Sequence, residues 1–213
     1  MAGAVTSAAA VVLVLFPADS AKAGELWNAK LISLDDSSVT RSPRPMQDRW
    51  TMDIESGVIW KVTNETPLDY TLAPQIVSLR GPRHFWGKAF GGKWVVRPQI
   101  SVLGEAIIDG PESRYLGFSA SPSIEWWNRS DQFSLFLAAG GGFGWVDSQD
   151  VPGGQGQDFT FNWSVKFGVR IRLNDHWFVS AAAFFQHMSN RGMTDLNPGL
   201  DALGGLLGVS YAF

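Results

Sequence analysis

The sequence predicts an all-β fold, an eight-stranded antiparallel transmembrane β-barrel. Three observations indicate it. Long segments alternate apolar and polar residues, which is the pattern of a strand with two unlike faces. Charged residues make up only 17% of the 213, below the roughly 25% typical of soluble domains, while Trp and Phe number 10 and 14. No apolar run reaches the about 20 residues of a membrane helix, so a form of this chain that spans a membrane must be a closed barrel.

The clearest alternation runs from Phe159 to Leu173. Every odd position in this segment is apolar, and the positions between them are polar, charged or glycine. Fifteen residues of this pattern exceed the roughly five or six of a soluble strand. They also cover the roughly 9–11 residues of a tilted membrane strand, so this segment predicts one.

Seven further segments carry the same pattern, some of them more weakly. Eight strands satisfy the even number that bacterial barrels use, and they leave an interior that side chains fill. The other seven are Met52–Val62, Leu68–Leu79, Trp94–Val102, Leu116–Trp126, Phe133–Trp145, Trp177–Ser189 and Ala202–Phe213. Charged residues of both signs fall on the polar faces, and we expect them to fill the interior as an ion-pair plug. They are Asp53, Glu55, Lys61, Arg97, Glu105, Glu125, Lys166, Arg170 and Arg172.

A soluble barrel, such as a lipocalin-like carrier, is the competing fold, because alternation alone does not say which face meets water. Two features favour the membrane version. The polar faces carry few charges, and aromatic residues lie near strand ends, where interfacial girdles are expected. The tryptophans in question are Trp50, Trp60, Trp94, Trp126, Trp145 and Trp177.

The chain begins with an expected export signal over residues 1–23, followed by a single barrel domain over 24–213. An apolar run, Ala8–Phe16, precedes Ala21-Lys22-Ala23, a small-x-small cleavage pattern. The run is too short for the alternative, a membrane anchor. We therefore expect a location in the bacterial outer membrane, with both termini in the periplasm. The polar segment 147–158 then becomes an outward loop, and Gly81–Lys93 a long periplasmic connection.

The composition argues against several classes of function. A net charge of −3 without a basic stripe gives no support for nucleic-acid binding. With no Cys, disulfides and thiolate metal sites are excluded, and no cluster of carboxylates or histidines suggests a metal. The run Gly140–Gly144 lacks the Lys-Ser/Thr of a phosphate loop, so we expect no cofactor.

Chemistry is expected near the end of the seventh strand. Of the three histidines, His84 and His176 have no neighbouring nucleophile and read as surface residues. His187 and Ser189 share one strand face, with Cβ atoms about 6–7 Å apart, so that a base can reach a hydroxyl. Asp201 begins the eighth strand, which pairs with the seventh, and can supply an acid. Parity places all three outward at the barrel's outer rim, which suits an enzyme whose substrate is a membrane lipid.

These residues resemble the C-terminal signature of the lipid A 3-O-deacylase family: His187-x-Ser189-Asn190, then Asn197-Pro198-Gly199 and an acid at 201. The resemblance implies an eight-stranded barrel whose His-Ser-acid triad faces the bilayer and hydrolyses the ester at position 3 of lipid A. It implies Ser189 as nucleophile, His187 as base and Asp201 as the acid that orients it. By the same resemblance, Asn190 donates to the oxyanion, and Asn197 shapes the loop or supports the oxyanion hole.

Two further expectations follow from the resemblance. The ending Tyr211-Ala212-Phe213 looks like the aromatic signal that the outer-membrane assembly machinery recognises. Asp201 is one methylene shorter than the Glu that the family typically carries there. Its contact with His187 is therefore expected to need a shifted backbone or a bridging water.

Other readings of the site stay open at this point. A non-enzymatic barrel for adhesion, binding or structure would treat His187 and Ser189 as polar residues of the rim. A lipid-modifying barrel could instead catalyse acyl transfer or phospholipid hydrolysis. Arg191 is either a partner for lipid A phosphates or an ordinary exposed arginine. The sequence also leaves a homodimer open.

Overall fold

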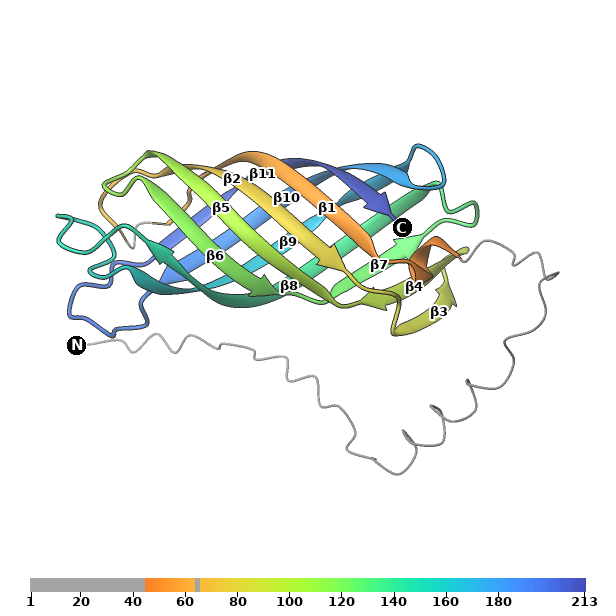
Figure 1. The fold of residues 1–213 in the computed structure, drawn as a ribbon, viewed down its shortest axis with the longest axis horizontal. Helices are drawn as coiled ribbons and strands as arrows, with labels where there is room; N and C mark the ends of the chain where they lie inside the picture. The colour runs from red at the N-terminus through yellow and green to blue at the C-terminus, as the bar shows by residue number, and fades with distance from the viewer. Residues whose placement is uncertain (1–44, 64–65) are drawn as a thin grey trace, which may run out of the picture. The chain divides into compact units, whose positions relative to one another are not determined.

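A computed structural model describes residues 45–63 and 66–213 of the chain (Figure 1). The expected export signal lies outside the described residues. The described residues form one short 3-10 turn and eleven strands. Their bounds are η1 Met46–Asp48, β1 Thr51–Lys61, β2 Thr71–Arg80, β3 Phe85–Ala89, β4 Gly92–Arg97, β5 Gln99–Asp109, β6 Arg114–Ala120, β7 Ser123–Trp127, β8 Phe133–Val146, β9 Phe159–Arg172, β10 Trp177–Ser189 and β11 Leu200–Ala212.

The strands close into an antiparallel barrel with eight positions, because β1 pairs with β11 and β8 with β9. The eleven strands fill eight positions because three positions hold two strands each: β2 with β3, β4 with β5, and β6 with β7. Prolines mark two of these breaks. Pro98 separates β4 from β5, and Pro122 separates β6 from β7. Proline has no N–H to donate to the ladder. The register nevertheless continues across the gap, from Arg97 paired with Ser123 to Ile100 paired with Ala120. The predicted eight-stranded barrel is therefore confirmed.

The interpretation of Gly81–Lys93 as a connection was wrong. Strand β3 pairs with β4 around a tight turn, in which Phe90 and Gly91 have φ angles of 50° and 73°. The backbone N–H groups of Gly81 and His84 donate to Pro98 and Val96, so β3 continues the β2–β5 ladder. The segment therefore extends the second and third barrel strands as one long hairpin. Its short length and exposed residues on both faces hide the alternation that identifies the other strands.

The two ends of the barrel differ. We call one the loop end; it carries the connections 62–70, 110–113, 147–158 and 190–199. The other, the terminal end, carries residue 45, the C-terminus, the turns 128–132 and 173–176 and the β3–β4 hairpin (Figure 1). Both described chain ends therefore lie together, as an even strand count requires, and segment 147–158 is a loop-end connection.

The exterior of the barrel is apolar. Every one of the eight barrel positions exposes large apolar side chains, among them Ile54 and Trp60 on β1 and Leu207 on β11, while charged residues between them point inward. A soluble barrel has the opposite arrangement, so this distribution is that of a transmembrane barrel. Among the described residues, no helix is long and apolar enough to cross a membrane.

Buried ion pairs occupy the interior towards the terminal end. Arg80 contacts both Asp53 and Glu125, and Lys166 contacts Glu55. Arg170 lies 3.4 Å from the same Glu125 carboxylate. These pairs support the predicted plug, but its central residue, Arg80, was missed because it ends a strand with weak alternation.

Four residues expected in the plug do not join these ion pairs. Lys61 pairs with Asp69 in the β1–β2 connection at the loop end, and Arg172 pairs with Asp175 in a turn at the terminal end. Arg97 is buried but donates to the Gly81 carbonyl oxygen at 2.7 Å rather than to an acid. Glu105 is also buried, and within the described residues it joins none of these ion pairs.

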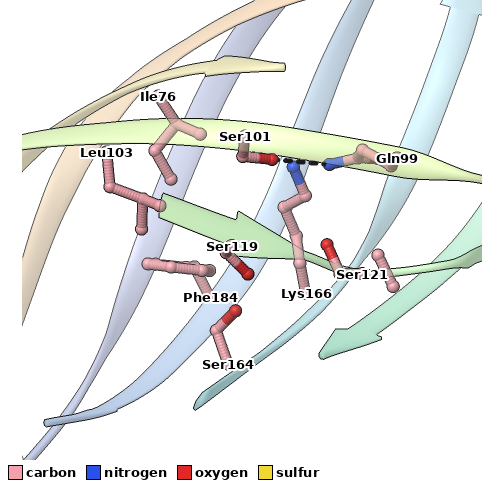
Figure 2. Close-up of a pocket in the computed structure, with 10 residues that line it drawn as sticks. Ile76, Gln99, Ser101, Leu103, Ser119, Ser121, Ser164, Lys166 and Phe184 are labelled. Carbon is pink, nitrogen blue, oxygen red and sulfur yellow. Dashed lines mark hydrogen bonds between the residues drawn. The ribbon is translucent and has the colours of Figure 1, made fainter. Parts of the chain in front are cut away.

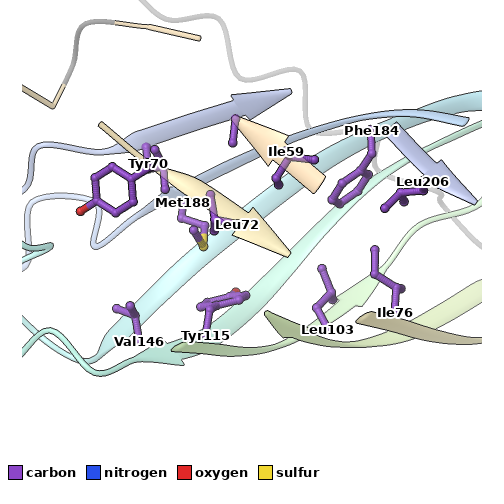
Figure 3. Close-up of a cluster of buried hydrophobic side chains, with 12 residues drawn as sticks. Ile59, Tyr70, Leu72, Ile76, Leu103, Tyr115, Val146, Phe184, Met188 and Leu206 are labelled. Carbon is purple, nitrogen blue, oxygen red and sulfur yellow. The ribbon is translucent and has the colours of Figure 1, made fainter. Parts of the chain in front are cut away.

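The rest of the interior is layered. A small cavity beside Lys166 is lined by polar and apolar side chains, and the polar ones include the hydroxyl groups of Ser101, Ser119 and Ser164 (Figure 2). Towards the loop end, an apolar cluster fills the barrel (Figure 3). Five members of the cluster lie in the strands or connections nearest the loop end: Tyr70, Leu72, Val146, Met188 and Leu200. The barrel therefore has a packed interior at the end where the chemistry was expected.

Candidate active site

Three polar side chains form a hydrogen-bonded series on strands β10 and β11. His187 and Asp201 face each other directly in the antiparallel ladder, and Ser189 lies two residues further along β10. The distance from His187 Nδ1 to Asp201 Oδ1 is 2.6 Å, and from His187 Nε2 to Ser189 Oγ it is 3.0 Å. The sequence predicted this grouping from strand parity and pairing alone. An imidazole between a carboxylate and a hydroxyl can accept the hydroxyl proton and be stabilised as a cation.

The shorter acid at position 201 reaches the histidine directly. A shifted backbone or a bridging water was expected, because Asp lacks one methylene of the family's typical Glu. Neither is needed, since directly opposed residues in an antiparallel ladder have Cβ atoms only about 4.5–5.5 Å apart. The position of Asp201 opposite His187 therefore compensates for its length.

The series faces outward, among apolar side chains. The neighbours of His187 on its own strand, Gln186 and Met188, are buried inside the barrel, whereas His187 is partly exposed. Trp163 of β9 stacks on the His187 ring, with centroids 5.8 Å apart and planes at 27°. Trp163 also contacts Phe185, which lies two residues before His187 on the same strand. A reacting molecule would therefore approach from the apolar exterior, at the loop end of the barrel wall.

The two predicted asparagines have clear structural roles. Asn190 is completely buried, and its side-chain amide donates to the Gln155 carbonyl oxygen, to Thr194 Oγ1 and to the Leu196 carbonyl oxygen. The amide has only two N–H groups, and these acceptors engage both. This arrangement contradicts the oxyanion-donor role expected of Asn190. Asn197 Oδ1 accepts from the Asn190 backbone N–H at 2.8 Å, which joins the two ends of the β10–β11 connection.

A buried carboxylate that the sequence did not point to ties the loops together. Glu112, in the β5–β6 turn, accepts from the Tyr70 hydroxyl and the Ser148 hydroxyl, both at 2.8 Å, and from the Gln155 backbone N–H at 3.0 Å. The Gln155 carbonyl oxygen in turn accepts from Asn190, the residue after Ser189. Hydrogen bonds therefore run from Glu112 through Gln155 to the side chain of Asn190, which directly follows Ser189. No local sequence signal could reveal this network, because its members lie in four separate connections.

Two titrating groups at the loop end are shifted by this packing. Burial raises the pKa of the Tyr70 hydroxyl, and its bond to Glu112 raises it further. Burial alone would also raise the pKa of Asp147. Hydrogen bonds from the Ser113 side chain and from the backbone N–H groups of Ser113 and Arg114 outweigh that effect and hold the Asp147 pKa below its ordinary value.

The remaining candidates lie apart from the series or on its margin. His84 is exposed beside β3, and His176 bonds to the Ala212 carbonyl oxygen in a turn at the terminal end. Arg191 is exposed, and its guanidinium lies 5.4 Å from the centre of the Phe161 ring. In the described part of the chain, no group of three or more His, Asp or Glu residues is arranged to hold a metal.

The fold and this site define a transmembrane β-barrel with a hydroxyl, an imidazole and a carboxylate in hydrogen-bonded series on its outward face. The model of the family described as lipid A 3-O-deacylase (PagL) matches residues 76–210, more than half of the chain and all three residues of the series. The chain belongs to this family. Comparison with curated proteins finds no match.

Several solved outer-membrane barrels are similar to the chain at low identity. The outer membrane enzyme PagL has 14% identity and a TM-score of 0.49, over 74% of this chain and 97% of that one. Ail, the attachment invasion locus protein of Yersinia pestis, has 11% identity and a TM-score of 0.43, over 78% and 99%. OprG from Pseudomonas aeruginosa has 9% identity and a TM-score of 0.38, over 78% and 96%.

Proposed function

We propose that the protein is an esterase of the bacterial outer membrane that hydrolyses the 3-O-linked acyl chain of lipid A. One observation carries the proposal: Ser189, His187 and Asp201 form a hydrogen-bonded series on the apolar exterior of the barrel. The family to which the chain belongs supports the substrate and the bond. The outward position supports a substrate that reaches the site from within the membrane.

The proposed reaction begins with attack of Ser189 Oγ on the ester carbonyl carbon, while His187 Nε2 takes the hydroxyl proton. Asp201 accepts from His187 Nδ1–H, which fixes the tautomer and stabilises the imidazolium that forms. His187 then protonates the departing sugar hydroxyl, leaving an acyl group on Ser189. Water, activated by the same histidine, releases the fatty acid and restores the serine.

The supporting residues keep the reacting groups in place. We propose that Asn190 and Asn197 order the β10–β11 connection beside the nucleophile, since their hydrogen bonds join its two ends. The chain end is proposed to serve assembly of the barrel, because the Phe213 ring is exposed at the terminal end. That end would lie in the periplasm, and the loop end with the series would lie in the outer leaflet, where lipid A is found.

The test is mass spectrometry of lipid A from cells that express the parent, Ser189→Ala or Ser180→Ala. Ser180 lies on the same strand, away from the series, and serves as a matched loss of a hydroxyl. We expect loss of one 3-hydroxyacyl group with the parent and with Ser180→Ala, and none with Ser189→Ala. Unchanged lipid A around a folded, membrane-inserted parent would contradict the deacylase and favour a non-enzymatic barrel. Deacylation by Ser189→Ala would contradict the proposed nucleophile.

A further inference from the structure

The β3–β4 hairpin carries a second surface that the deacylase reaction does not use. It lies at the terminal end of the barrel, opposite the series (Figure 1). The hairpin is held firmly rather than loosely tethered. Strand β4 pairs with β7, Trp126 Nε1 donates to the Ala89 carbonyl oxygen at 3.1 Å, and Arg129 Nε donates to the Gly91 carbonyl oxygen at 3.2 Å. Its surface is therefore a fixed part of the barrel.

The tip of the hairpin exposes an aromatic residue in an unfavourable setting. Phe90 is 95% exposed, and its φ of 50° is in the left-handed region that favours Gly, Asn and Asp. Asn at this position would suit both the turn and water better. Phenylalanine is unfavourable here both for the turn conformation and for contact with water. Its presence therefore indicates that the ring lies in an apolar environment outside the protein.

Further aromatic residues extend this apolar surface towards the membrane-facing wall. Phe85 and Trp94 point to the exterior of the hairpin and are exposed, in line with the apolar exterior of β5 and β6. Aromatic residues that continue an apolar band past the end of a barrel are typical of the membrane–water interface. The aromatic side of the hairpin therefore adjoins the bilayer rather than open solvent.

The other side of the hairpin is cationic. A hollow in the surface at its tip is lined by residues 88–93, 128 and 129, which include Lys88, Lys93 and Arg129. Lys93 also pairs with Asp131, which does not line the hollow. No carboxylate lines the hollow, so its charge is complementary to an anion. Cations beside interfacial aromatics match the phosphate headgroups of an anionic leaflet.

We propose that the β3–β4 hairpin is an interfacial anchor that binds the headgroups of anionic phospholipids in the leaflet at the terminal end. Phe90 enters the boundary between headgroups and acyl chains, while Lys88, Lys93 and Arg129 surround a lipid phosphate in the hollow. The inference rests on the proposed membrane location but not on deacylation. The anchor would fix the depth and tilt of the barrel, and hence the height of the series in the opposite leaflet.

The chain contains no cysteine, so single cysteines can carry a nitroxide label without competition. The label at Ala89→Cys reports on the hairpin. Val102→Cys, on the apolar exterior of β5, is the lipid reference, and Gln149→Cys, in an exposed connection, is the aqueous reference. The full-length barrel is placed in bilayers of phosphatidylcholine, with or without phosphatidylglycerol. Collision with oxygen and with a water-soluble nickel chelate then measures how deeply each label lies.

We expect the label at residue 89 to lie between the two references and to move deeper as phosphatidylglycerol is added. The measured quantity is the phosphatidylglycerol fraction at which half of this change in depth has occurred. Lys88→Gln should raise that fraction about fivefold, as expected for the loss of one cation near an anionic surface. Arg114→Gln, a matched loss of an exposed cation at the loop end, should leave it unchanged. Phe90→Asn fits the turn better than the parent, so loss of depth in this variant cannot be attributed to misfolding.

Two results would overturn the anchor. One is a label at residue 89 as accessible to nickel as residue 149 in both bilayers, which would favour a soluble protein partner or no partner. The other is a phosphatidylglycerol effect that survives Lys88→Gln combined with Arg129→Gln. In either case, the label at residue 102 must still report lipid, which shows that the barrel was inserted. Deacylase activity enters neither measurement, so a failed deacylase and a failed anchor are distinguishable.

Discussion

Replacing the acid of the series tests the proposed mechanism most directly. In Asp201→Asn, the side chain keeps its size and its place opposite His187, but it can present an N–H to the imidazole. Its amide N–H would then donate to His187 Nδ1 and place the ring proton on Nε2. With the proton on Nε2, the ring cannot accept the Ser189 proton, and the imidazolium loses its negative neighbour.

The expected magnitude is large, because the contact is direct. Asp201 Oδ1 lies 2.6 Å from His187 Nδ1, and no second acid of the described residues forms an ion pair with that nitrogen. The analogous change in serine proteases lowers kcat by about 10⁴, which corresponds to about 5.5 kcal/mol in the activation free energy. We expect a loss of this order in kcat here, with little change in KM, because Asp201 does not contact the substrate in the proposed reaction.

The assay is the initial rate of 3-hydroxy fatty acid release from purified lipid A in mixed micelles, followed by mass spectrometry. Asp201→Glu is the matched variant, because it keeps the carboxylate and changes only its reach. It should lose far less activity than Asp201→Asn. A kcat for Asp201→Asn within tenfold of the parent, in a folded barrel, would refute the role of Asp201 in orienting the histidine. Equal losses in both variants would indicate a packing requirement instead.

Three further predictions concern the framework of the site and the barrel. Glu112→Gln replaces an acceptor oxygen by an NH₂ group facing hydrogen-bond donors, and should destabilise the loop end by about 2–3 kcal/mol, seen as faster amide exchange in segment 147–158. Arg80→Met leaves Asp53 buried without its ion pair and leaves Glu125 with only the longer contact to Arg170, and should lower the free energy of unfolding by about 3–5 kcal/mol in a denaturant titration; an unchanged midpoint would contradict the plug. Asp147 has a lowered pKa, so its stabilising contribution is present above the ordinary Asp pKa and is lost as pH falls through the folded value. Asp147→Asn should therefore lower the unfolding midpoint at pH 7 but not at a pH below the folded value, and a difference that persists in acid would contradict this cause.

The sequence was informative wherever one strand face had to be apolar. The fifteen-residue alternation of Phe159–Leu173 predicted β9 almost to its ends, and parity placed His187 and Ser189 on one face. Pairing of the last two strands then brought Asp201 to the histidine, because neighbouring strands joined by one connection pair with each other. These inferences need only period and order, which a single sequence contains.

The features that were missed depend on contacts between distant segments. Strand β3 is short and exposes aromatics on both faces, so its pairing with β4 is not visible as a period. Asn190 matched a family motif, yet its amide is directed into the loops by the Gln155 carbonyl oxygen, 35 residues away in sequence. The role of Glu112 likewise depends on partners in other connections. Side-chain direction in irregular connections follows from tertiary contacts, which periodicity does not encode.

The packing of the barrel explains why the series lies on the outside. Towards the loop end, the interior is filled by an apolar cluster in which Met188 and Leu200 are almost completely buried (Figure 3). Each of these residues is adjacent in sequence to a member of the series, so the same strand ends that present His187, Ser189 and Asp201 outward close the interior with their alternate side chains. An interior site at this height would require a cavity in that cluster, which destabilises a core in proportion to its volume. In an eight-stranded barrel with this packing, a large substrate can therefore reach reactive side chains only on the exterior wall. That wall is covered by lipid, so the fold itself favours a substrate drawn from the membrane.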